Sequence, residues 1–148
     1  MRRNFLTGKP LEGKSITDIS WHGVDVNQPP DWHNPDTKIL AFTLSGFEEN
    51  EADIHVVMNM SDQKFTMQLP DIQGKKWCLA VDTSLKSPKD IIKPQDQKPL
   101  SKPHYHVDSR TITVFESLES HSGTYDQQST NKPLEFISKI TGLRFFDD

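Results

Sequence analysis

The sequence lacks most of the features that mark membrane proteins, secreted proteins and disulfide-stabilised domains. Cys78 is the only cysteine in 148 residues, so no intrachain disulfide can form, and a single thiol is typical of a reducing compartment. The longest apolar run, Ile39–Leu44, is far shorter than the roughly 20 residues that span a bilayer. The N-terminus has no apolar signal core. These absences predict a cytoplasmic location and no membrane partner.

Positive charge is also scarce. The 17 lysines and arginines are outnumbered by 21 acidic residues, which gives a net charge of -4, and only Arg2 and Arg3 are adjacent. Nucleic-acid-binding domains usually carry a basic patch and a high pI. The sequence therefore argues against nucleic acid as a partner. A neutral polymer such as a glucan is compatible, because sugars are bound by aromatic stacking and hydrogen bonds.

Hydrophobic residues are few as well, at 33%, so we expect a thin core with long polar segments outside it. No alternation of strands with helices is visible. About seven short segments have strand patterning: 16–21, 38–44, 53–60, 64–69, 76–82, 104–107 and 111–115. This pattern predicts an all-β fold, an antiparallel two-sheet β-sandwich of Greek-key type, with a candidate short C-terminal helix.

Period-two alternation assigns faces to the strands. In 64–69 the residues Phe65, Met67 and Leu69 form an apolar face opposite a wet one. Segment 53–60 has the same pattern, with its apolar face on the side of Val56 and Met58. Segment 38–44 is apolar on both sides, so we expect a central strand covered on both faces. Ser61-Asp62, between two of these strands, predicts a tight hairpin.

Two long irregular segments and a polar tail separate or follow the strands. Residues 23–37 and 84–103 are rich in proline, and loops of this length are often specialised. Residues 117–148 are expected to form a polar tail. Within it, 132–141 has Pro133 where a first helical turn accepts proline and apolar residues at helical spacing. The spacing predicts a short amphipathic helix that needs a surface to dock on.

Catalytic motifs are missing from the sequence. No glycine-rich phosphate loop and no Gly-x-Ser-x-Gly turn occurs, and none of the acidic residues lies in a recognisable acid–base motif. We expect Asp18, Asp53 and Asp71 to lie on the solvated surface. The chain alone is therefore expected to be non-catalytic, with no catalytic residues.

Two further groups of residues have a chemical and a structural interpretation. His104 and His106 share one strand face at a metal-compatible spacing, but no matched third ligand accompanies them, so we favour an exposed or half-buried edge strand. Cys78 is interpreted as a small buried hydrophobe, not a nucleophile. No metal and no cofactor are predicted.

The three tryptophans differ in setting. Trp77 shares a strand face with Leu79 and is assigned to the core. Trp32, in the proline-rich loop, and Trp21, at a strand end, are the candidate substrate-binding residues, because an exposed indole can stack on a glucose ring. The alternative is that Trp32 closes the end of the sandwich or covers a neighbouring domain.

Several phrases, in one consistent order, carry a resemblance to a known family. They are Arg2 to Gly8, Asp18 to His22, Asp31-Trp32, Leu40 to Phe42, Val57 to Met60, Phe65 to Pro70, Trp77 to Thr83 and Val107 to Val114. Together they cover about residues 2–116 and resemble the C-terminal β-sandwich domain of isoamylase-type glycogen debranching enzymes, members of the α-amylase superfamily, in their cyanobacterial form. Ser61 to Lys64 departs from the family pattern, and the stretch after Ser117 has no counterpart in it.

The resemblance implies a non-catalytic domain. The family hydrolyses α-1,6 branch linkages with carboxylates on a (β/α)8 barrel, and none of the barrel motifs matches this chain. It implies that residues 1–14 are the end of a barrel or a linker, that 15–116 are the sandwich domain, and that the partner is a catalytic barrel in the same chain or a separate subunit. The domain would stabilise the barrel, and an α-glucan is a further candidate partner.

Two alternatives stay open at this point. The chain is a free-standing carbohydrate-binding module if Trp32 or Trp21 is a sugar platform. It is a protein-interaction module if the helix at 132–141 docks on a partner or on a second copy of the chain.

Overall fold

The computed structural model describes residues 6–12, 17–48 and 50–119. The described part contains seven β-strands and one 3-10 helix, η1 (Pro94–Asp96). The strands are β1 (Ile19–His22), β2 (Ile39–Leu44), β3 (Ile54–Asn59), β4 (Phe65–Gln68), β5 (Lys75–Asp82), β6 (His104–Val107) and β7 (Thr111–Glu119). Each lies within a few residues of its predicted position, although β7 continues beyond the expected end at 115. The candidate helix at 132–141 lies outside the described residues.

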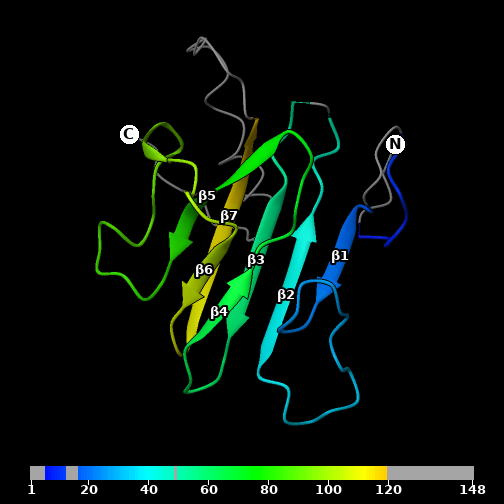
Figure 1. Cartoon of the computed structure of the whole chain (residues 1–148), viewed down its shortest axis with the longest axis vertical. Coiled ribbons are helices and arrows are strands. Elements are labelled where there is room, and N and C mark those ends of the chain that lie inside the picture. Colours follow the sequence, from blue (N-terminus) through cyan, green and yellow to red (C-terminus); the bar gives the residue numbers. More distant parts are fainter. Residues whose placement is uncertain (1–5, 13–16, 49, 120–148) are drawn as a thin grey trace.

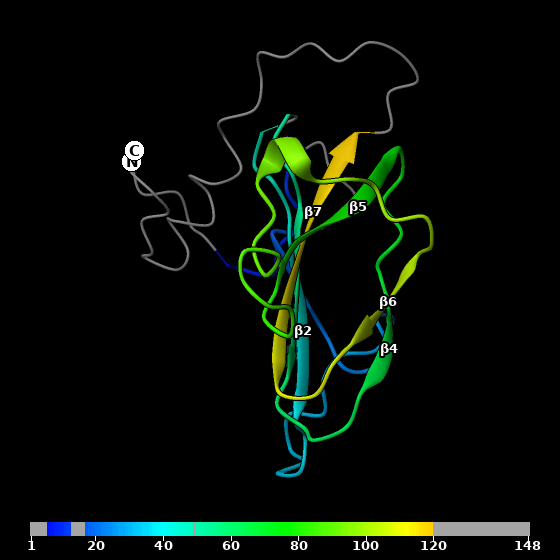
Figure 2. The ribbon, with the colours of Figure 1, turned by 90° about the vertical axis from the view of Figure 1, so that its left-hand side faces the viewer.

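The strands form two antiparallel sheets, as the sequence predicted (Figure 1). The large sheet has the order β1-β2-β3-β7-β5, and the small sheet pairs β4 with β6. Seen from the side, the small sheet forms a second layer against one face of the large sheet (Figure 2). We call this face of the large sheet the inner face and the opposite one the outer face. The predicted all-β sandwich is confirmed.

The hairpin predicted at Ser61-Asp62 does not form. β3 belongs to the large sheet and β4 to the small one, and from β3 onward the chain alternates between the two sheets. The partner of β4 is β6, which lies about 40 residues further along. Turn chemistry marks the end of a strand, but it does not specify which strand pairs with the next one.

The main core lies between the two layers. Its buried members are Val26, Ala41, Val57, Met67, Leu69, Trp77, Val107 and Phe115. The predicted inward face of 64–69 is confirmed, since Met67 and Leu69 are buried and Phe65 packs against them. The core position predicted for Trp77 is also confirmed, and its indole Nε1 donates to the carbonyl oxygen of Pro70 at 2.7 Å.

β3 has the two different faces that the sequence predicts, but the face expected to be wet is the one buried between the sheets. His55, Val57 and Asn59 are the fully buried residues that face the small sheet, whereas Val56 and Met58 point to the outer face. The two polar side chains tolerate this burial because they form hydrogen bonds, His55 to Thr43 and Asn59 to backbone carbonyls.

β2 also has one buried face and one partly exposed face. It is a central strand as predicted, with Ala41 and Thr43 buried on the inner face. Leu40 and Phe42 on the outer face are only half-buried, so the expected cover on both faces is wrong at these two positions.

Residues 84–103 form a strap along β5. Backbone hydrogen bonds run from Asp82 N to Asp90 O, from Ile92 N to Ala80 O and from Leu100 N to Trp77 O. Isolated bridges pair Val81 with Ile91 and Cys78 with Pro99. In the side view the part of the strap around η1 lies on the outer face, opposite β4 and β6 (Figure 2). Among the described residues, the strap therefore covers the β5 side of the outer face, and side chains on the β1–β3 side stay accessible.

Two of the three carboxylates expected on the surface are buried. Asp53 forms a 2.9 Å ion pair with Nζ of Lys75, and its Oδ1 accepts from the backbone of Gly46. Burial acts to raise the pKa of Asp18, but bonds from the N–H and hydroxyl of Thr7, and then from the N–H groups of Gly8 and Ile19, hold it below the usual value. Only Asp71 is exposed.

Candidate docking and ligand-contact surfaces

The outer face of the large sheet is almost wholly apolar. Cross-strand pairs place Trp21 opposite Phe42, Leu40 opposite Met58, Phe42 opposite Val56, Val56 opposite Val114, and Met58 opposite Ile112. A sheet face that only meets water normally carries polar residues at these positions. The pattern is therefore that of a sheet with two packing faces.

Burial on this face changes along the strands. At one end Ile19, Leu44 and Ile54 are buried and form a second small core. Toward the other end the side chains become accessible, and Ile112 is 38% and Met60 55% exposed. The accessible half of the outer face is thus a continuous apolar surface on β1, β2, β3 and β7.

The two candidate sugar platforms lie together at the edge of this surface. The rings of Trp21 and Trp32 are 5.5 Å apart in an edge-to-face arrangement, and Trp21 also packs on Phe42 at 5.2 Å. Trp21 remains 42% and Trp32 61% exposed. The sequence identified both residues but did not show that they form one aromatic cluster.

Next to Trp32 the surface is hollowed. The hollow has a volume of about 350 Å³, and its lining is more apolar than polar. Its residues come from the proline-rich loop and from β2 and β3: Pro30, Asp31, Trp32, Asn34, Thr37, Lys38, Ile39, Leu40, Met58 and Met60. Asp31 and Asn34 shape the loop by accepting bonds from the backbone N–H groups of His33 and Asp36. A mainly apolar lining with a few polar groups is typical of a small-molecule site.

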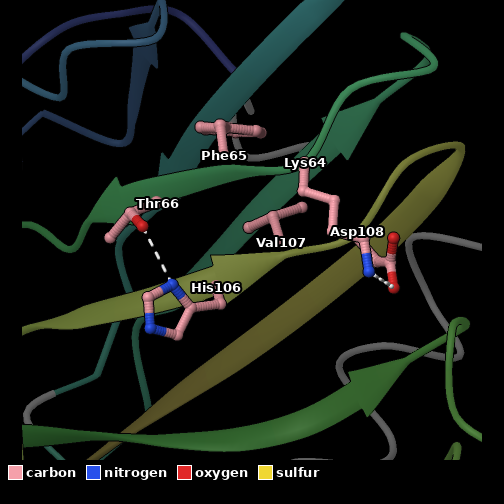
Figure 3. Close-up of a pocket in the computed structure, with 6 residues that line it drawn as sticks. All are labelled: Lys64, Phe65, Thr66, His106, Val107 and Asp108. Carbon is pink, nitrogen blue, oxygen red and sulfur yellow. Dashed lines mark hydrogen bonds and ion pairs between the residues drawn. The ribbon is translucent and has the colours of Figure 1, made fainter.

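A second, shallower groove of about 300 Å³ lies on the outward side of the small sheet (Figure 3). Thr66 Oγ1 and His106 Nδ1 face each other across β4 and β6 at 2.9 Å. Lys64 and Asp108 are 3.4 Å apart at the rim, and both side chains are exposed. These polar groups bond to one another, and the aromatic residue of the lining, Phe65, packs against the main core.

The histidines of β6 do not form a metal site within the described residues. The rings of His104 and His106 are 6.1 Å apart on the outward side of the small sheet, in agreement with an exposed or half-buried strand. No cluster of three or more metal-ligating side chains occurs in the part of the chain that the structure describes.

The buried ionisable groups serve structural contacts. Besides Asp18 and Asp53, the buried carboxyls are Asp82, bonded to Tyr105, and Glu116, bonded to Gln97. Cys78 is fully buried, and burial, followed by the nearby Glu116, raises the pKa of its thiol to about 11. A thiol that stays protonated at neutral pH is a poor nucleophile, in agreement with the structural role predicted for Cys78.

Sequence reasoning did not show that these apolar residues face outward. The alternating pattern correctly groups Val56 and Met58 on one apolar face, but the opposite face, expected to be wet, is the one buried between the sheets. The signal that identifies them as surface residues is the second apolar face of β2, which leaves more apolar side chains than one thin core can hold.

Comparisons with known proteins agree with this architecture. Residues 20–122 match the family described as "Isoamylase 1-3, C-terminal". The chain is also similar to the protein named "Isoamylase 3, chloroplastic" from Oryza sativa subsp. japonica, with 31% identity over 91 residues. That match covers 61% of this chain and 10% of the rice protein, so the chain corresponds to a small part of its relative. Within the described ranges no helix is long and apolar enough to cross a bilayer. The family match spans most of the chain, and this protein therefore belongs to the isoamylase 1–3 C-terminal domain family.

Proposed function

We propose that this domain docks through the outer face of its large sheet on the catalytic (β/α)8 barrel of a debranching enzyme and stabilises that barrel. The observation that carries the proposal is the accessible apolar surface on β1, β2, β3 and β7. Burying one large apolar side chain stabilises a contact by about 1.5–3 kcal/mol relative to leaving it in water. A face built from many such residues favours a permanent partner over solvent.

The catalytic barrel is the occupant that best suits this face. The family is a C-terminal domain, and the matched part is 10% of the rice relative, so in that protein the domain is joined to a much longer chain. A partner within the same protein meets the face at a high effective concentration. The hydrolysis of α-1,6 branch linkages would then belong to the partner, not to this domain.

The test uses an isoamylase-type catalytic barrel from which its own C-terminal domain has been removed. Added to it, this chain should raise its melting temperature and co-elute with it. Ile112→Glu, at an outer-face position that is already accessible, should abolish both effects. Thr66→Glu on the outward side of the small sheet is the matched control and should behave as the unmodified chain. Equal binding by the two variants would contradict docking through the outer face.

The hollow beside Trp32 favours a second candidate function, contact with an α-glucan. The exposed indole offers a flat apolar face for a glucose ring, and Asp31, Asn34 and Lys38 line the same hollow. Affinity electrophoresis in glycogen tests this candidate. The chain should be retarded, Trp32→Ala should migrate freely, and Phe65→Leu in the opposite sheet should be retarded normally. Unretarded migration of the unmodified chain would rule out glucan binding by this domain alone.

Three sequence predictions remain proposals. They are the division at 1–14, 15–116 and 117–148, the amphipathic helix at 132–141 and the cytoplasmic location. Because β7 runs to Glu119, a truncation that tests the tail should end after this residue. Circular dichroism of the full and truncated chains would report the helix, and their masses in solution would show whether the tail mediates self-association.

A further inference from the structure

A buried carboxyl fastens the strap to the large sheet. Glu116 lies on the outer face of β7 and is 1% exposed. Its register partners are Cys78 on β5 and Ile54 on β3. In the part of the chain that the structure describes, no lysine or arginine forms a salt bridge with it. A carboxylate in such a place lacks the compensation that buried charges need.

Among the described residues, the hydrogen-bond partner of this carboxyl comes from the strap. The amide Nε2 of Gln97 donates to Oε2 of Glu116 at 3.1 Å and to the carbonyl oxygen of Ile92 at 3.3 Å. The other oxygen of each side chain, Oε1 of Gln97 and Oε1 of Glu116, is buried and has no hydrogen-bond partner among the described residues. The pair therefore holds two unsatisfied acceptors and lacks a donor.

A proton on Glu116 supplies the missing donor. It removes the charge from the buried site and turns one carboxyl oxygen from an acceptor into an O–H donor. Burial acts in the same direction, because it raises the pKa of Glu116 against the smaller, opposing effect of the Gln97 bond. Ionised Glu116 places a charge in the buried site and has no O–H donor.

We propose that Glu116 stays a neutral carboxylic acid in the folded protein to a higher pH than an exposed glutamate does, and that its contact with Gln97 is a latch that holds the strap on β5 until Glu116 ionises. Ionisation leaves a buried charge facing unsatisfied oxygens, and the strap lifts to let water reach it. The bonds lost with it include Ile92 N to Ala80 O and Leu100 N to Trp77 O.

The other ionisable groups around the latch are few. From β5, Cys78 faces Glu116 and is itself neutral near pH 7, while Lys76, the next outward residue, is exposed. From the strap, Lys93, Asp96 and Lys98 are exposed to solvent. At the neighbouring end of β3, Asp53 is paired with Lys75. Glu116 is thus the buried group in this cluster whose charge is not matched by an ion pair.

Two measurements on the full chain test the latch. A 13C NMR titration of the glutamate carboxyls, with the Glu116 signal assigned by its loss in Glu116→Gln, should show that Glu116 ionises at a higher pH than the exposed glutamates. Hydrogen exchange of the strap amides, corrected for intrinsic rates, should accelerate by at least about tenfold as Glu116 ionises. In Glu116→Gln, which keeps a neutral side chain of the same shape, strap exchange should not respond to pH in this range.

Each control separates the latch from a general loss of stability. Glu48→Gln, at an exposed position, should retain the pH response of the unmodified chain. Gln97→Ala should give fast strap exchange at every pH, while amides of β2 and β3 stay protected. A Glu116 that ionises at the same pH as the exposed glutamates, or the same pH response in Glu116→Gln and the unmodified chain, would overturn the proposal. If Glu116→Gln does not fold, the Gln97→Ala result still decides.

Discussion

The phenol of Tyr105 donates a 2.7 Å hydrogen bond to Oδ2 of Asp82, and this bond joins the two sheets of the sandwich. Tyr105 lies on β6 in the small sheet, whereas Asp82 is the last residue of β5 in the large sheet. The other oxygen of Asp82 accepts two bonds from Ser84, so the carboxylate is fixed in place. Burial, with an added effect of Asp82, raises the pKa of the phenol, which keeps it a donor.

Removing this donor should weaken the contact between the sheets. Tyr105→Phe keeps the ring, which packs edge-to-face on Phe115, but leaves Asp82 with an unsatisfied buried oxygen. We expect the free energy of unfolding in urea to fall by about 1.5–3 kcal/mol. Thr66→Ala, which removes an exposed bond on the outward side of the same sheet, should change it by less than about 0.5 kcal/mol. Equal values for the two variants would mean that the inter-sheet bond contributes nothing.

Replacing the buried amide of Asn59 with a carboxylate should destabilise the fold. Its Nδ2 donates to the carbonyl oxygens of Gln63 and Asp108, so it joins the turn after β3 to the turn before β7. Asn59→Asp replaces this donor with an oxygen that faces two carbonyls, and we expect a loss of about 2–4 kcal/mol in thermal or urea unfolding. Asn34→Asp is the control, because Asn34 uses only its oxygen, to accept from Asp36 N. A tolerated Asn59→Asp would contradict this role.

The two ion pairs among the described residues should differ sharply in their contribution to the free energy of unfolding. Lys75 and Asp53 are 2.9 Å apart with side chains 17% and 1% exposed. Lys75→Met leaves the buried carboxylate uncompensated and should cost about 3–5 kcal/mol of unfolding free energy. Lys64→Met removes the exposed pair with Asp108 and should have no measurable effect, since water already screens it. The same denaturation assay compares both, and similar losses would show that burial does not set the difference.

A chain of hydrogen bonds fixes the protonation of two buried histidines. Nδ1 of His22 lies 2.6 Å from the carbonyl oxygen of Val26, which only accepts, so this nitrogen carries the proton. Nε2 of His22 then accepts from the hydroxyl of Thr43, and Thr43 accepts in turn from Nδ1–H of His55. Nε2 of His55 is left as a buried acceptor without a donor.

This arrangement predicts acid sensitivity. Burial, with a smaller effect of His22, lowers the pKa of His55 from 6.5 to about 3. The unfolded chain therefore binds a proton at His55 before the folded chain does, and stability should fall as the pH drops from 6.5 toward 3. His55→Gln should remove this part of the slope, up to about 1.4 kcal/mol per pH unit. The measurement is urea unfolding across this range, with exposed His33→Gln as the control; parallel profiles for all three proteins would contradict the prediction.

Local patterns in the sequence determined the strands and the family. Side chains alternate with a period of two in any strand, so β2, β3 and β4 were visible without knowledge of their partners. The resemblance to the family rested likewise on short local phrases such as Trp77 to Thr83, and the family match covers 20–122. Trp77 in the core and Cys78 as a buried, inert thiol followed from these patterns.

Only the tertiary structure decided which faces are buried and which strands pair. Alternation shows that β3 has two different faces, but it does not state which one turns inward. His55 and Asn59 turn inward because Thr43 bonds to Nδ1 of His55, and the carbonyl oxygen of Asp108, 49 residues further along, accepts from Asn59. The same long-range bonding buries Asp53 beside Lys75 and sets Gln97 against Glu116.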